Sequence, residues 1–280
     1  MLPIRQRFDL GSIELSCLEW NRGREPLLAI HGLGDCAVVW HSLGDYLAEK
    51  YHIIAPDMRG HGESGKPAKG YAFTDAIADL EALMNRLGWN NAHILGHSWG
   101  GKLAAIWATQ NPQRFKSMIL VDPIFITKMP SILKLTFPIL YRTLDSFKGM
   151  GPFTSYRVAE AQAPTLGKYA GWSPLQKLVF QESIEQKPDG QWGTKFVVPA
   201  RNQIFEEVMR VAGLTEPIDI PTLFVQPAKG VNRTEWQLKP YKTHLTRLTL
   251  QKIAGNHWPF LVEPDIFNRT VEEFLSDMVL

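Results

Sequence analysis

The chain has few features that would suggest a metal site, a disulfide framework, a membrane anchor or a nucleic-acid surface. Only two cysteines, Cys17 and Cys36, occur among 280 residues, and neither a CxxC pair nor an HExxH motif is present. The formal net charge is only +2 and Lys and Arg form no dense run, which argues against nucleic acid as a partner. No apolar run is long enough to cross a bilayer, and the first residues lack the apolar core of a secretory signal. We therefore expect a cytoplasmic protein without metal or cofactor that makes no membrane contact.

The composition and the pattern of apolar residues favour an α/β domain. Hydrophobic residues make up 45% of the chain, enough for a large core. Short apolar runs alternate with stretches of helical periodicity, which is typical of a mostly parallel sheet flanked by helices. The runs predict eight strands, near 4–9, 13–19, 27–31, 52–56, 92–96, 118–122, 222–226 and 247–253. Helices are expected near 42–50, 74–88, 100–111 and 264–279.

This alternation breaks between Pro123 and about Thr215, where prolines, aromatic residues and isolated helical patches, near 174–183 and 201–211, replace it. We expect residues 124–215 to form a helical lid inserted after the sixth strand, with residues 1–123 and 216–280 forming the core. Within the lid, 129–141 is expected to be a buried helix rather than a segment on a membrane surface. An apolar lid of this kind suits a small apolar ester or acyl substrate.

The pentapeptide Gly96-His97-Ser98-Trp99-Gly100 lies between a predicted strand and a predicted helix. A side chain at such a sharp turn is held in a strained backbone conformation, and small neighbours let the strand and the helix approach each other closely. The hydroxyl group then projects from the edge of the sheet. We therefore predict that Ser98 is a nucleophile.

A serine hydroxyl attacks efficiently only when an imidazole takes its proton, and a carboxylate must orient that imidazole. Of the eight histidines, His257 follows the last predicted strand, at the carboxyl edge where α/β sheets place their ligand sites. We predict that His257 is the base. His31, His61 and His97 stand in glycine-rich turns, and we expect them to brace loops by hydrogen bonds.

An oxyanion developing at the substrate needs backbone N–H donors in a tight loop after a strand. The sequence His31-Gly32-Leu33-Gly34 follows such a strand, and its glycines allow the amide of Leu33 to turn inward. The amide of Trp99, directly after the predicted nucleophile, is the second candidate donor.

Four motifs together resemble those of the α/β-hydrolase superfamily, and the resemblance covers nearly the whole chain outside the predicted lid. They are HGLG at 31–34, PDMRGHGESG at 56–65, GHSWGG at 96–101 and GNHWPFLVEP at 255–264. The resemblance implies an α/β-hydrolase fold with Ser98 as nucleophile, His257 as base, and Leu33 and Trp99 as oxyanion donors. It also implies that Asp57 and Arg59 brace a loop.

The acid departs from the pattern of most of this superfamily, which places it in a GxxD loop after the strand at 222–226. Here Gly230 stands where that acid would fall. Some members, haloalkane dehalogenases among them, carry the acid at the end of the preceding core strand, where this chain has Asp122. We predict Asp122 as the acid, with Glu235 as the alternative.

These residues predict a serine hydrolase that cleaves a carboxylic ester, a thioester or a lactone through an acyl-enzyme, with a carboxylesterase as the first choice. Ser98 argues against haloalkane dehalogenase and epoxide hydrolase chemistry, in which an aspartate is the nucleophile. Two alternatives stay open. One is hydrolysis of a carbon–carbon bond in a diketone, and the other is a small-molecule receptor on the same fold that turns over slowly or only once.

Overall fold

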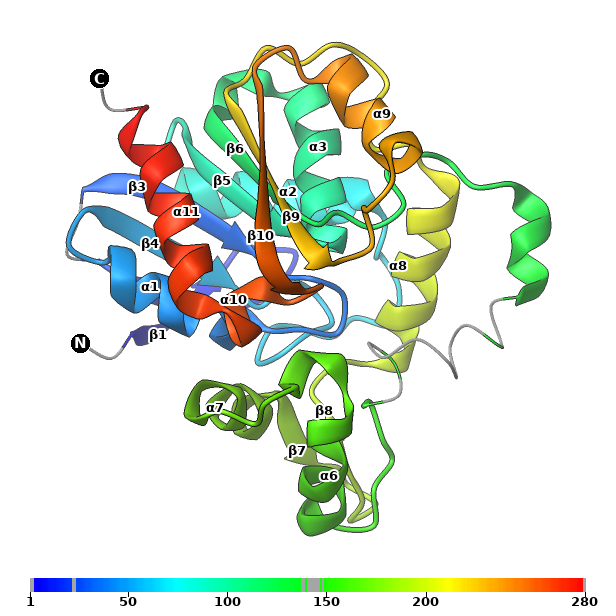
Figure 1. Cartoon of the computed structure of the whole chain (residues 1–280). Helices are drawn as coiled ribbons and strands as arrows, with labels where there is room; N and C mark the ends of the chain where they lie inside the picture. Colours follow the sequence, from blue (N-terminus) through cyan, green and yellow to red (C-terminus); the bar gives the residue numbers. More distant parts are fainter. Residues whose placement is uncertain (1–2, 22–23, 137–138, 140–146, 148, 279–280) are drawn as a thin grey trace.

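The structure is a computed structural model that describes all residues except 1–2, 22–23, 137–138, 140–146, 148 and 279–280. Its framework is an eight-stranded sheet with the order β1-β2-β4-β3-β5-β6-β9-β10 (Figure 1). Two pairings, β1 with β2 and β2 with β4, are antiparallel, and the other five are parallel. The strands are β1 (Ile4–Asp9), β2 (Glu14–Trp20), β3 (Glu25–Ile30), β4 (Tyr51–Pro56), β5 (Ala92–His97), β6 (Phe115–Val121), β9 (Thr222–Lys229) and β10 (Leu248–Asn256). The predicted mostly parallel sheet of eight strands is confirmed.

Alternation along the strands divides the core into two layers. In β3, Leu28 and Ile30 belong to one layer while Leu27 and Ala29 belong to the other, because successive side chains of a strand point to opposite faces. Helices cover both layers, which is why the central strands are continuous apolar runs. The helices on the first face are α2 (Phe73–Arg86), α3 (Trp99–Gln110) and α9 (Glu235–His244), and those on the second are α1 (His41–Leu47), α10 (Pro259–Val262) and α11 (Pro264–Ser276).

The segment between β6 and β9, residues 124–215, is called the insertion below. It contains α6 (Tyr156–Gln162), α7 (Pro174–Ser183), the hairpin of β7 (Ile184–Gln186) and β8 (Trp192–Thr194), and α8 (Val198–Arg210), with short 3-10 turns at Ser131–Thr136, Ala163–Thr165 and Gly167–Tyr169. The helical patches expected at 174–183 and 201–211 are present as α7 and α8, whereas the hairpin was not expected. Figure 1 shows α6, α7 and the hairpin beyond the edge of the sheet at which β10 ends. This part of the insertion therefore lies where the parallel strands place the motif loops.

The expected buried helix at 129–141 is wrong where the structure describes this segment. Residues 131–136 form a 3-10 turn, and the side chains of Ile132 and Leu135 are 70% and 77% exposed. Residues 137–138 and 140–141 lie outside the described residues. Apolar composition alone did not reveal that these side chains point away from the core.

Candidate active site

Ser98 occupies a sharp turn between β5 and α3. Its backbone has φ 53° and ψ −113°, a conformation that costs energy for a residue with a side chain. The turn requires glycine on either side, since a Cβ on Gly96 would lie 2.4 Å from the carbonyl oxygen of Gly100. A Cβ on Gly100 would likewise lie 2.6 Å from the carbonyl oxygen of His31. The backbone thus holds Ser98 at the carboxyl edge of the sheet.

His257 and Asp122 come from two other strand ends and meet Ser98. His257 lies between β10 and α10, and its Nε2 is 2.9 Å from the Ser98 Oγ. Its Nδ1 is 2.6 Å from Asp122 Oδ2, at the end of β6. Because an ionised carboxylate only accepts hydrogen bonds, Nδ1 donates to Asp122 and Nε2 is left to accept from the serine hydroxyl. This tautomer is the one that can take the Ser98 proton.

Asp122 is fully buried and held by several donors. Beside His257, its carboxylate accepts hydrogen bonds from the backbone N–H of Val231 at 2.8 Å and of Asn232 at 3.0 Å, and from Asn232 Nδ2 at 2.9 Å. Burial raises the pKa of this carboxyl group, but the hydrogen bond from His257 and those from the 231–232 loop outweigh it, so the pKa lies below its usual range. Asp122 is therefore ionised at neutral pH.

The structure does not bring Glu235 to this cluster. Glu235 is the first residue of α9, its side chain is 81% exposed, and it pairs with Lys242 at 2.6 Å. The hydrogen bond from Lys242 lowers the pKa of Glu235. Of the two candidate carboxylates, only Asp122 reaches His257.

Leu33 and Trp99, the predicted oxyanion donors, lie in the two loops next to Ser98. Trp99 is the first residue of α3, so its N–H has no acceptor within the helix. Leu33 is followed by Gly34, whose φ of +77° turns the loop and whose N–H donates to His61 Nε2 at 3.2 Å. Within the part of the chain that the structure describes, no hydrogen bond uses the N–H of Leu33 or of Trp99. Both amides are thus available to an oxygen atom outside the protein.

The residues expected to brace loops make such contacts. Arg59 forms a two-pronged ion pair with Asp79 on α2, with N–O distances of 2.7 and 2.6 Å. Asp57 accepts from the backbone N–H of Ala37 at 2.7 Å and from Arg5 at 3.0 Å. His31 Nε2 accepts from a backbone N–H in the same region, that of residue 58. These side chains fix the loops that surround Ser98.

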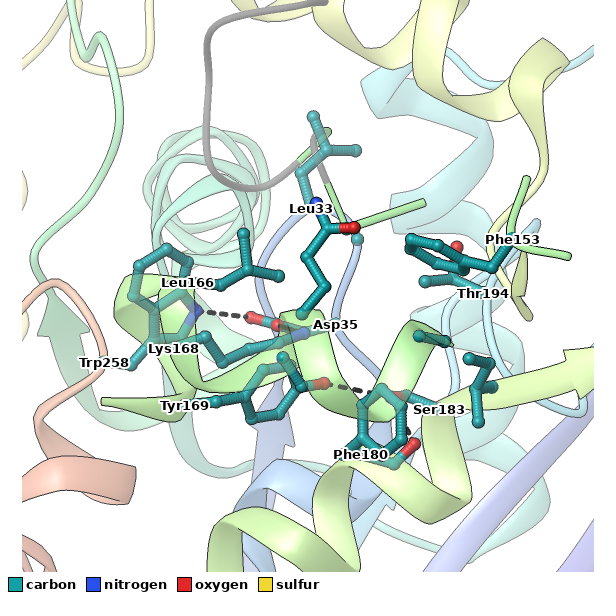
Figure 2. Close-up of a pocket in the computed structure, with 16 residues that line it drawn as sticks. Leu33, Asp35, Phe153, Leu166, Lys168, Tyr169, Phe180, Ser183, Thr194 and Trp258 are labelled. Carbon is teal, nitrogen blue, oxygen red and sulfur yellow. Dashed lines mark hydrogen bonds and ion pairs between the residues drawn. The ribbon is translucent and has the colours of Figure 1, made fainter. Parts of the chain in front are cut away.

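A pocket beside this cluster lies between the insertion and the core (Figure 2). Its free volume is about 30 Å³. Leu33 lines it from the core, and so does Trp258, the neighbour of His257, whereas Ser98 and His257 are not among its lining residues. Six apolar residues of the insertion also line it: Phe153, Ala159, Ala163, Leu166, Phe180 and Ile184. The pocket offers an apolar environment next to the predicted oxyanion donor.

One charged pair in this pocket was missed by the sequence reasoning. Lys168 of the insertion places its Nζ 2.9 Å from Asp35 Oδ1, and both side chains are largely buried. Burial opposes both charges, but each partner outweighs it: Lys168 lowers the pKa of Asp35, and Asp35 raises the pKa of Lys168. Asp35 directly follows the HGLG motif, which could have marked it. Nothing in the sequence marks Lys168, which lies 133 positions further along the chain.

Among the described residues, no group of three or more His, Cys, Asp or Glu side chains is placed to hold a metal ion. No helix in the same part of the chain has the length and apolar character needed to cross a membrane.

The fold and the cluster define the class of the protein: a mostly parallel α/β sheet that carries a serine, a histidine and an aspartate at its carboxyl edge. A model of the alpha/beta hydrolase fold family matches residues 25–150. The fluoroacetate dehalogenase of Burkholderia sp. is 30% identical over 300 residues, which cover 98% of this chain and 94% of that protein. The chain belongs to the α/β-hydrolase fold family.

Two other similarities extend this comparison. The soluble epoxide hydrolase of Corynebacterium sp. (strain C12) is 33% identical over 116 residues, which are 41% of this chain and only 39% of that protein. The crystal structure of E-2-(acetamidomethylene)succinate hydrolase superposes with a TM-score of 0.81 at 21% identity, covering 98% of this chain and 99% of the other. At this identity the superposition shows a common fold. The names of these relatives span several kinds of reaction, so they leave the substrate of this chain open.

Proposed function

We propose that the protein is a serine hydrolase that cleaves a carboxylic ester, or a related thioester or lactone, through an acyl-enzyme. The observation that carries the proposal is the continuous hydrogen-bonded line from Ser98 Oγ to His257 Nε2, and from His257 Nδ1 to Asp122 Oδ2, at 2.9 and 2.6 Å. A serine in this arrangement loses its proton to the imidazole as it attacks, and the carboxylate stabilises the imidazolium that forms.

The reaction would proceed in two steps, acylation of Ser98 by the ester and hydrolysis of the acyl-enzyme by water. Ser98 attacks the carbonyl carbon of the ester while His257 takes the hydroxyl proton, and the N–H groups of Leu33 and Trp99 bind the developing oxyanion. His257 then gives the proton to the leaving alcohol, which departs and leaves the acyl group on Ser98. A water molecule repeats the sequence, so that the acid is released and Ser98 regains its proton.

The pocket supports an uncharged, apolar acyl group of modest size. Its wall is mainly aromatic and aliphatic, and Lys168, the one cation among the described residues that line it, is already neutralised by Asp35. A free volume of about 30 Å³ is about that of one water molecule, so even a short acyl chain would require the insertion to move as a lid. The proposed enzyme is therefore a carboxylesterase for short apolar esters.

Turnover of p-nitrophenyl butyrate, together with labelling by a fluorophosphonate probe, tests the proposal. Wild type should release many equivalents of p-nitrophenol, and mass spectrometry should locate a single phosphonyl group on Ser98. Ser98→Ala should lose both signals, while circular dichroism reports whether it remains folded.

Each alternative has its own outcome. A burst of one equivalent followed by silence would favour a receptor that reacts once. Labelling of Ser98 without turnover of esters, thioesters or lactones, but with cleavage of a 1,3-diketone, would favour carbon–carbon bond hydrolysis. Absence of any label on folded wild type would refute the proposed nucleophile.

A further inference from the structure

The loop that carries His257 is bound to the insertion on both sides of the histidine. On one side, Asn256 Nδ2 donates to the carbonyl oxygen of Gly167 at 2.8 Å. The Asn256 Oδ1 atom in turn accepts the backbone N–H of Trp258 at 2.9 Å. Asn256 therefore fastens the turn around His257 and joins that turn to residue 167 of the insertion.

On the other side the contact runs through Asp35. Lys168 Nζ binds Asp35 Oδ1 at 2.9 Å, and Asp35 Oδ2 accepts the indole N–H of Trp258 at 3.2 Å (Figure 2). The side chains of Lys168 and Asp35 are only 13% and 3% exposed, so little solvent screens their attraction. One buried carboxylate thus holds a residue of the insertion and the residue after His257 together.

A third contact reaches His257 itself. His97, next to Ser98, donates from Nε2 to the carbonyl oxygen of His257 at 2.8 Å, and its Nδ1 lies 3.4 Å from Asp35 Oδ2. The imidazole of His97 is buried between Asp35 and the backbone of His257. Among the described residues His97 Nδ1 has no hydrogen-bond partner, so its contact with Asp35 is one of packing.

We infer that Lys168 and Asp35 are positioning residues. Together with the contact between Gly167 and Asn256, they attach the insertion to the His257 loop. This attachment holds the loop in the geometry in which His257 Nε2 can take the Ser98 proton. We call these four residues the histidine clamp. The hydrogen bond between Ser98 and His257 spans chain segments 159 positions apart, so its length depends on how these segments are held together. Docking of the insertion would then both close the pocket and order the base, and a substrate would be hydrolysed only under a docked insertion. This inference rests on the proposed function for its catalytic part.

Lys168→Met tests the clamp because methionine keeps much of the apolar length of the side chain and removes the charge. The matched control is Lys195→Met. Lys195 also joins the insertion to the core, through an ion pair with Glu63 at 2.5 Å, but that pair makes no contact with the His257 loop. A general loosening of the insertion should affect both variants, whereas loss of the clamp should affect only Lys168→Met.

The expected result is a split between kcat and KM. In Lys168→Met we expect kcat for p-nitrophenyl butyrate and the rate of Ser98 phosphonylation to fall together by about tenfold to a hundredfold, since small misplacements of a base are costly. KM should stay within about threefold, because the apolar wall is unchanged. Lys195→Met should retain kcat within about twofold.

Lys168→Met also leaves the Asp35 carboxylate buried without its partner, so lost stability must be separated from lost positioning. The double variant Lys168→Met/Asp35→Asn removes that charge while its amide oxygen can still accept from Trp258. We expect it to recover the melting temperature of wild type but to keep the reduced kcat. Recovery of both would show that Lys168 acts only on stability and would overturn the inference.

Amide hydrogen exchange provides a readout that does not depend on catalysis. The peptide covering 255–262 should exchange about tenfold faster in Lys168→Met than in wild type or Lys195→Met. Equal exchange in all three proteins, or equal kcat in the two single variants, would overturn the clamp. If wild type shows no turnover and no label, the proposed function fails, and the exchange comparison still decides whether the clamp exists.

Discussion

The buried Lys102 should give this protein a stability that depends on pH in a calculable way. Lys102 lies on α3, four residues after Ser98, and its side chain is fully buried. Its Nζ donates to the carbonyl oxygens of Phe125 and Val208, both at 2.6 Å, and so joins α3 to the two ends of the insertion. Burial lowers the pKa of this amine from 10.5 to about 7, against the weaker attraction of Glu207.

The direction of the effect follows from proton binding. Between the folded pKa of about 7 and the unfolded value of 10.5, the unfolded chain holds a proton on Lys102 that the folded chain has released. The free energy of unfolding must therefore rise with pH across this window, and the cost of burying the charge is greatest below about pH 7. From about pH 7 to about pH 9, Lys102 alone should add about 2 kcal/mol to the free energy of unfolding.

Urea unfolding of wild type and Lys102→Met at both pH values isolates this contribution. Burial raises the pKa of Cys17 and Cys36, so these thiols titrate near this window only in the unfolded chain; they affect both proteins equally and cancel in the difference. In Lys102→Met the carbonyl groups of Phe125 and Val208 lose their hydrogen-bond donor, which changes the free energy of unfolding by an amount that does not depend on pH. The stability difference should grow by about 2 kcal/mol in favour of wild type at the higher pH, whereas Lys69→Met, at an exposed position, should show no such growth. A difference that stays constant between the two pH values would refute the reasoning.

Three further predictions concern the carboxylate of the site, each measured as kcat on p-nitrophenyl butyrate. Asp122→Ala should lower kcat by about three to four orders of magnitude, because His257 loses its orienting partner, while an apolar ligand should bind nearly as before by calorimetry. Glu235→Ala should retain kcat within about twofold, because this side chain is exposed and makes only a surface ion pair. If Glu235→Ala were inactive and Asp122→Ala active, Glu235 and not Asp122 would be the acid that orients His257. Gly230→Ala should lower kcat by about tenfold or more, since its Cβ would lie 2.5 Å from Asp122 Oδ2. Full activity would show that the 230–232 loop can move to make room for this Cβ.

The strands of the core were predictable because parallel strands buried on both faces are apolar along their whole length. The run at 92–96 and the observed β5, Ala92–His97, differ by one residue. Ser98 and His257 could also be predicted, since their placement depends mainly on where a strand ends. Asp122 was predicted through the resemblance to family members with the acid at the end of this strand, and the structure brings Asp122, directly after Val121, to His257.

Elements stabilised by only a few core contacts were harder to predict. Helix α9 buries only Leu238 and Tyr241 and contains Pro240, so neither its periodicity nor its composition favours a helix. Its start depends instead on the side chain of Thr234, which accepts the N–H of Gln237. Contacts such as that between Lys168 and Asp35 could not be predicted from the sequence, because they depend on how the insertion docks onto the core.

The loop after β9 gives a physical reason why the carboxylate that reaches His257 is that of Asp122 and why no side chain stands at position 230. In this chain that loop supplies donors: the N–H groups of Val231 and Asn232 both point at the Asp122 carboxylate. A Cβ at position 230 would approach Asp122 Oδ2 to 2.5 Å, so a carboxylate at 230 and one at 122 would compete for one space. Two buried carboxylates at that separation would also repel each other and raise the pKa of at least one of them. Glycine at position 230 is therefore part of what holds Asp122 ionised and aimed at His257.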